Sequence, residues 1–178
     1  MKMLVRSLGL LSVGLLVAVV IYPTLHELGH ALAAILVGAR VKAWSVFPLS
    51  YVVCDFSGAS PQAMAVVSLA GLLFPLLVSS VSCGGFWVWC AQLFLKCAAL
   101  AALLLSGVTT LLLVNGNGVA QDDMAQLQQW QPYGIWVATI VIGAAAATAV
   151  FLLFRERPFA RCAEFLTGDF RRTDTSVN

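Results

Sequence analysis

The stretch LGLLSVGLLVAVVIYPTLHELGHALAAILV, Leu8–Val37, is apolar except for a small group around two histidines and one glutamate. His26 and His30 are the only two histidines of the chain, and Glu27 lies between them. A helix crosses a bilayer with about 20 apolar residues, so this longer run predicts a tilted or kinked membrane span. Pro23 precedes the polar group and lacks a backbone donor, so we expect it to bend the helix there.

The composition of the whole chain predicts a lipid environment. The chain has 178 residues, of which 61% are hydrophobic and 10% charged, with a mean hydropathy of +0.94. Soluble domains carry about 25% charged residues. The formal net charge of +2 is too small to indicate a nucleic-acid partner. The five cysteines form no CxxC pair, so neither a disulfide framework nor a cysteine metal site is expected.

The rest of the chain predicts further spans separated by turn-forming residues. Residues 38–61 are rich in β-branched and aromatic side chains, which favours a short hairpin or a re-entrant segment. The fold class is therefore an all-α polytopic membrane protein with about four transmembrane helices. We expect a membrane-embedded domain over residues 1–154 and a polar C-terminal tail over residues 155–178. The later spans are expected at Gln62 to about Ser82, Phe86 to about Val114 and Pro132–Phe154, with a short polar helix at Asp122–Trp130.

Four spans place both ends of the chain on one side of the membrane. Lys2, Arg6 and the arginines of the tail outnumber Arg40 and Lys42, so the positive-inside rule puts both ends in the cytoplasm. A cleaved signal peptide is the alternative for the basic, apolar N-terminus. The nearest small-residue cleavage site, Ala31–Ala34, lies beyond the histidines, so a retained span is expected. We expect a multi-pass protein of the bacterial inner membrane.

The histidines and a pair of aspartates are expected at the same membrane face. His26 and His30 lie in the C-terminal half of the first span, and Asp122 and Asp123 follow the third span. Odd-numbered spans cross the membrane in the same direction. Both polar groups therefore approach the same face, which is a geometric condition for a common site.

The HExxH pattern on a helix is typical of a zinc site. His26 and His30 are four residues apart, so they share one helix face and can hold one Zn²⁺ ion. Glu27 is offset by about 100° around the helix axis, where it can accept a proton from a coordinated water. Ionisable residues within spans cost about 2.5–3.5 kcal/mol each and usually mark a function. We therefore predict metal binding rather than simple packing.

Catalytic zinc usually has three protein ligands, and no third histidine exists. The carboxylates before the tail are Asp55, Asp122 and Asp123. Asp122 and Asp123 are the main candidates, although an acidic pair at a helix N-terminus also complements the helix dipole. Asp55 is a reserve ligand that is better explained as a surface turn residue. We expect Lys96, in the third span, to pair with a neighbouring helix or snorkel rather than contact the site.

Several of these segments resemble the site-2 protease family of intramembrane zinc metalloproteases. The likeness rests on HELGHALAA within a span, on Ala70-Gly71 in the second span, and on Asn115 upstream of a carboxylate. It implies a zinc metalloendopeptidase that cleaves membrane-anchored protein substrates, with Glu27 as catalytic residue. It also implies His26, His30 and Asp123 as zinc ligands, with Asp122 as the alternative third ligand.

The chain departs from the family pattern and looks like a minimal, divergent member. Met124 follows Asp123 where a glycine is usual, and Leu72 and Pro75 stand where proline and asparagine are expected. The resemblance implies a metal site nearer the cytosol, whereas the charge distribution places the site toward the opposite face.

Two other functions compete with proteolysis. A catalytically inactive membrane chaperone or scaffold would keep the fold, but a structural site has no need for Glu27. A metal transporter would require polar residues along the second and fourth spans, which supply almost none.

Overall fold

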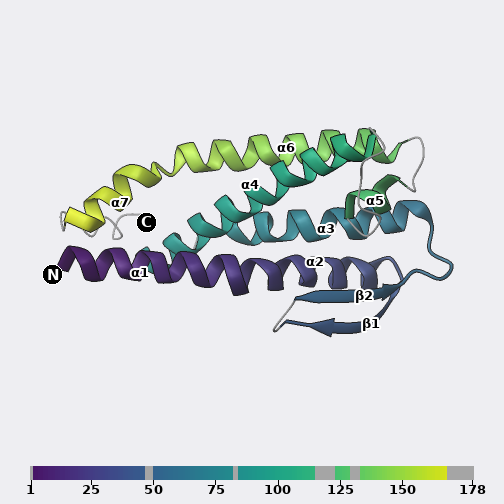
Figure 1. The fold of residues 1–178 in the computed structure, drawn as a ribbon, viewed down its shortest axis with the longest axis horizontal. Coiled ribbons are helices and arrows are strands. Elements are labelled where there is room, and N and C mark those ends of the chain that lie inside the picture. The colour runs from purple at the N-terminus through teal and green to yellow at the C-terminus, as the bar shows by residue number, and fades with distance from the viewer. Residues whose placement is uncertain (1, 47–49, 82–83, 115–122, 129–132, 168–178) are drawn as a thin grey trace, which may run out of the picture.

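A computed structural model describes residues 2–46, 50–81, 84–114, 123–128 and 133–167. The described residues include four helical stretches that are long and apolar enough to cross a membrane. This confirms the predicted all-α polytopic class. Figure 1 shows the long helices running roughly side by side, with a small hairpin beside one half of the first. The chain is an integral multi-pass membrane protein.

The first span is one long helical stretch with an irregular middle. It consists of α1 (Lys2–Leu16), a π-helical segment η1 (Val17–Ile21) and α2 (Tyr22–Leu36). It begins six positions before the predicted Leu8, because the basic N-terminal residues join the helix. The π-helical turns end directly before α2, whose second residue is Pro23. Since Pro23 donates no backbone hydrogen bond, the irregularity lies where the sequence predicts a bend.

An antiparallel hairpin follows α2 and confirms the first of the two alternatives for residues 38–61. Strand β1 (Arg40–Ser45) pairs with β2 (Tyr51–Asp55), and Arg40 lies opposite Asp55. Figure 1 shows the hairpin alongside α2. The Ser50 hydroxyl donates to the carbonyl oxygen of Pro23 over 3.2 Å, which ties the hairpin to the start of α2.

The remaining helices form the body of the bundle. Helix α5 lies within the predicted polar helix Asp122–Trp130, whose residues 122, 129 and 130 are outside the described part of the chain. The bounds of the long helices agree with the predicted spans within a few residues. The bounds are α3 Pro61–Ser80, α4 Phe86–Val114, α5 Asp123–Gln128, α6 Gly134–Arg155 and α7 Pro158–Thr167.

The core lies between α3, α4, α5 and α6. Leu72 of α3 and Leu103 of α4 are almost fully buried, and so are Met124 and Leu127 of α5. Because Met124 and Leu127 are three residues apart, they lie on one face of this short helix. Their burial fixes α5 against the bundle, so that its first residue, Asp123, lies next to His26 and His30 of α2.

The N-terminal end of α1 and the C-terminal end of α7 meet at one end of the bundle. The Arg6 guanidinium donates to the carbonyl oxygen of Phe165 over 2.8 Å. The Phe165 ring in turn stacks on Phe86 at the start of α4, with ring centroids 4.0 Å apart. This contact agrees with the prediction that both ends of the chain lie on the same side (Figure 1).

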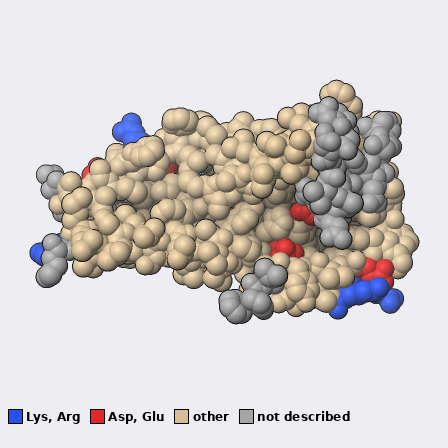
Figure 2. Space-filling model, in the orientation of Figure 1, with Lys and Arg blue, Asp and Glu red and all other residues tan. Residues whose placement is uncertain are grey.

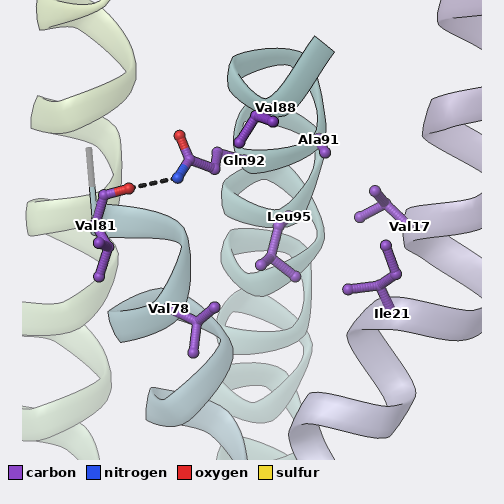
Figure 3. Close-up of a pocket in the computed structure, with 8 residues that line it drawn as sticks. All are labelled: Val17, Ile21, Val78, Val81, Val88, Ala91, Gln92 and Leu95. Carbon is purple, nitrogen blue, oxygen red and sulfur yellow. Dashed lines mark hydrogen bonds between the residues drawn. The ribbon is translucent and has the colours of Figure 1, made fainter. Parts of the chain in front are cut away.

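A cavity of about 390 Å³ lies between η1, α3 and α4. Its lining is apolar apart from Gln92, whose amide donates to the carbonyl oxygen of Val81 (Figure 3). None of the predicted site residues lines it. The lining residues are Val17, Ile21, Val78, Val81, Val88, Ala91, Gln92 and Leu95.

Lys96 is buried in α4 and pairs with a carboxylate that follows α6. Its side chain is 3% exposed, and its Nζ lies 2.5 Å from Oε1 of Glu156. Glu156 is the residue that caps the C-terminus of α6. The ion pair therefore joins two spans and agrees with the expectation that Lys96 pairs with a neighbouring helix.

We expect Lys96→Met to destabilise the protein by about 3–5 kcal/mol, because it leaves the Glu156 carboxylate without its partner in the bundle. The double variant K96M/E156M should recover most of this loss, since apolar side chains can replace both charges. Thermal unfolding in detergent measures both effects.

Lys42→Met is the matched control for this ion pair. Lys42 Nζ lies 2.9 Å from Asp55 Oδ2, but the lysine side chain is 61% exposed. Solvent screens such a pair, so K42M should change the unfolding temperature little. If K96M and K42M lower the unfolding temperature equally, burial of the Lys96–Glu156 pair does not contribute to stability.

Candidate metal centre

One face of α2 presents both histidines. They are four residues apart, and their Nε2 atoms lie 3.1 Å from each other. The rings meet edge to face, with centroids 4.6 Å apart and an interplanar angle of 89°. His30 is the more buried, with a side chain that is 8% exposed against 20% for His26. The helix thus directs two imidazole nitrogens to the same point.

Asp123 reaches this point from the first residue of α5. Its Oδ2 lies 3.4 Å from Nε2 of His26 and 3.3 Å from Nε2 of His30. Burial raises the pKa of the Asp123 carboxyl, but the hydrogen bonds with the two imidazoles outweigh burial and hold this pKa below its usual range. The carboxylate is therefore ionised at neutral pH.

These three side chains offer one donor atom each, and the donor atoms lie within 4.8 Å of one another. A tetrahedral zinc ion with bonds of about 2.0–2.1 Å separates its ligand atoms by about 3.3–3.4 Å. The observed separations of 3.1, 3.3 and 3.4 Å are close to this value. The donor set therefore fits a single metal ion with three protein ligands.

A backbone carbonyl orients one of the two imidazoles. Nδ1 of His30 donates to the carbonyl oxygen of Val67 in α3 over 2.8 Å. A carbonyl oxygen only accepts, so Nδ1 carries the ring proton and Nε2 keeps its lone pair in the neutral tautomer. That is the tautomer which a metal ligand bound through Nε2 requires.

Glu27 follows His26 directly on α2. Its side chain is partly buried, and it has no hydrogen bond or ion pair among the described residues. Figure 2 shows acidic atoms in a hollow of an otherwise mostly uncharged face. The Glu27 carboxylate, one residue along α2 from His26 and without a partner among the described residues, is therefore available to accept a proton.

Tyr22 is a further polar group of this region that the sequence analysis does not single out. It lies four residues before His26, and the two ring centroids are 6.0 Å apart. Its hydroxyl is buried without a hydrogen-bond partner in the described part of the chain. The same four-residue spacing that joins His26 to His30 could have indicated it.

The reserve ligand, Asp55, has partners of its own in the hairpin. Asp55 pairs with Lys42 and accepts a hydrogen bond of 3.0 Å from the backbone N–H of Ser57, as a turn residue does. The Lys42 ammonium and Ser57 hold the pKa of its carboxyl below the usual range. Asp122, the alternative third ligand, lies outside the described residues, as does Asn115.

A comparison with family models matches residues 4–83 to Peptidase M50B-like proteins. The matched segment contains His26, Glu27, His30 and Gly71, and it ends before Asp123. No curated protein and no solved structure matches the chain significantly.

Proposed function

We propose that this chain is an intramembrane zinc metalloendopeptidase of the site-2 type. The match of residues 4–83 to Peptidase M50B-like proteins supports this proposal. Its substrates in this proposal are membrane-anchored proteins. Peptide hydrolysis is the chemistry that the family name and the HExxH pattern share. That the chain is a membrane protein related to metalloproteases holds whether or not it cleaves peptides.

The single observation that carries the proposal is the convergence of three donors from two distant segments. His26 and His30 come from the first span, and Asp123 follows the third span, yet their donor atoms lie 3.1–3.4 Å apart. Packing alone gives no reason to gather two imidazoles and a carboxylate within an apolar bundle. Ionisable groups in spans usually mark a function because they are costly to insert.

Each residue has a distinct role in this proposal. His26, His30 and Asp123 would hold the ion, and the bond to the Val67 carbonyl orients the His30 ring. Bound Zn²⁺ supplies Lewis acidity, which acidifies water and polarises the scissile carbonyl group. Glu27 takes the proton from the attacking water and later gives it to the leaving amine. With three protein donors, the centre would leave room beside the ion for water or substrate.

The substrate in this proposal must present an extended peptide to the site. Peptide bonds in a transmembrane helix are internally hydrogen-bonded, so the substrate has to unwind before hydrolysis. The hairpin next to α2 supports this step, because an exposed strand edge can pair with an extended segment. Its Trp44 and Tyr51 side chains are about half exposed.

The test is metal content and cleavage by the same purified protein. The wild-type chain in detergent, freed of metal and then incubated with Zn²⁺, should retain one zinc ion per chain by mass spectrometry. It should cleave a membrane-anchored reporter in liposomes, and a zinc chelator should stop the reaction. Zinc bound at this ratio without cleavage across a broad substrate panel would instead favour a non-catalytic membrane chaperone or scaffold.

A further inference from the structure

Gly71 of α3 lies directly against the His30 ring. A Cβ atom at position 71 would lie 2.3 Å from Nε2 of His30 and 2.4 Å from its Cε1. Real Cβ atoms essentially never approach so closely, so a side chain at this position would force the imidazole or the helix to shift. Two other helical glycines, Gly107 in α4 and Gly143 in α6, have open space where a Cβ would be.

Val67, whose carbonyl oxygen accepts the hydrogen bond from Nδ1 of His30, lies one helical turn before Gly71. In an α-helix the carbonyl of residue 67 points toward residue 71 and receives its N–H. The same carbonyl oxygen of Val67 also accepts the bond of 2.8 Å from His30. The ring therefore lies along α3 from the Val67 carbonyl to the space above Gly71. A methyl group at position 71 would occupy that space.

This role differs from the close approach of backbones that glycine often permits between helices. Gly29 of α2 has that second role, because a Cβ there would lie 2.6 Å from the carbonyl oxygen of Ala70 and 2.8 Å from Cβ of Phe74. At Gly71 the three nearest atoms all belong to the His30 imidazole. The space at Gly71 is thus matched to the ring and not to the packing of two helices.

We propose that Gly71 is a positioning residue, which leaves room for His30 to bond the Val67 carbonyl while its Nε2 faces His26 and Asp123. The inference rests on the proposed function, because it concerns the same metal centre. It adds that α3, which contributes no ligand to the centre, determines the tautomer and direction of one imidazole.

The test compares Gly71→Ala with Gly107→Ala, the same change in a helix where the new methyl group meets nothing. G71A should weaken zinc binding about 10–100-fold, the usual cost of losing a group that orients a ligand. G107A should bind zinc as the wild type does. Competition with a chromophoric chelator measures both affinities without reference to activity.

A spectroscopic readout separates positioning from general loss of structure. With saturating Co²⁺, the visible absorption of the wild type should be that of a four-coordinate ion, and G107A should reproduce it. In G71A the bands should shift or weaken, because His30 no longer presents Nε2 at the same place. An unchanged zinc affinity together with an unchanged cobalt spectrum in G71A would overturn the inference.

The metal-free protein provides a second, independent measurement. G71A should lower the unfolding temperature of the wild type but not that of His30→Ala, which lacks the ring that the methyl group strikes. An equal loss in both backgrounds would overturn the inference.

The two proposals fail in distinguishable ways. Zinc binding by the wild type without peptide cleavage would end the proposed function alone. A wild type that binds no zinc would end both.

Discussion

Glu27→Gln should retain zinc and lose peptide cleavage. The amide keeps the size of the carboxylate but cannot accept a proton at neutral pH. General acid–base catalysis contributes about 10²–10⁴-fold to a rate, so we expect a loss of kcat of at least this order. The zinc content should equal that of the wild type, because Glu27 is not among the three converging donors.

The matched control is Glu164→Gln, which makes the same change on the exposed surface of α7. E164Q should cleave the reporter at the rate of the wild type. Full activity in E27Q would remove Glu27 from the reaction and leave the metal centre without a general base. Loss of zinc in E27Q would instead give this carboxylate a role in holding the ion.

Asp123→Asn should abolish tight zinc binding, whereas Asp122→Asn should not. The change in Asp123 removes the negative charge next to both imidazoles, at 3.3 and 3.4 Å from their Nε2 atoms. Loss of a group that merely orients a ligand costs about 10–100-fold in metal affinity, so loss of a ligand should cost more than about 100-fold. Zinc affinity and cleavage should fall together in D123N.

The neighbouring aspartate provides the control, because D122N makes the same change at the adjacent position. If D122N loses zinc and D123N retains it, the third ligand is Asp122 and the contacts of Asp123 are incidental. If both variants retain zinc, the three-donor centre is wrong, and with it the proteolytic function.

The sequence predicted the long helices well because their apolar runs are bounded by clear breakers. The predicted span from Phe86 to about Val114 agrees with α4, and the predicted start at Gln62 is one residue after that of α3. Pro23 indicated a disturbed first span, but proline chemistry alone does not say that the preceding residues form π-helical turns. The hairpin was one of two alternatives, since β-branched residues with turn formers also suit a re-entrant segment.

The contacts between segments could be predicted only in part. The number of membrane crossings correctly predicted that Asp123 lies at the same face as His26 and His30, because odd-numbered spans run in the same direction. The position of Asp123 within this centre depends on α5, which is held by the burial of Met124 and Leu127. Met124 stands where the family usually has glycine, and nothing in the sequence indicates that its side chain anchors α5 in the core.

Other features of the centre leave no signal in a single sequence. The bond from His30 to Val67 uses a backbone carbonyl, which every residue has. Gly71 was singled out by its resemblance to a family motif, but its contact with the His30 ring requires coordinates. Likewise, the preference of Lys96 for a neighbouring helix was predicted, while its partner Glu156 was not.

The wide separation of the donors along the chain bears on how the protein is made. The imidazoles lie on α2, whereas the carboxylate lies on α5 and is synthesised only after α3 and α4. A partly synthesised chain therefore holds both histidines but no complete coordination sphere. Under the proposed function, hydrolytic capacity would therefore arise late in biogenesis, once α5 has docked. A partly synthesised chain would then be unable to cleave neighbouring proteins in the insertion machinery.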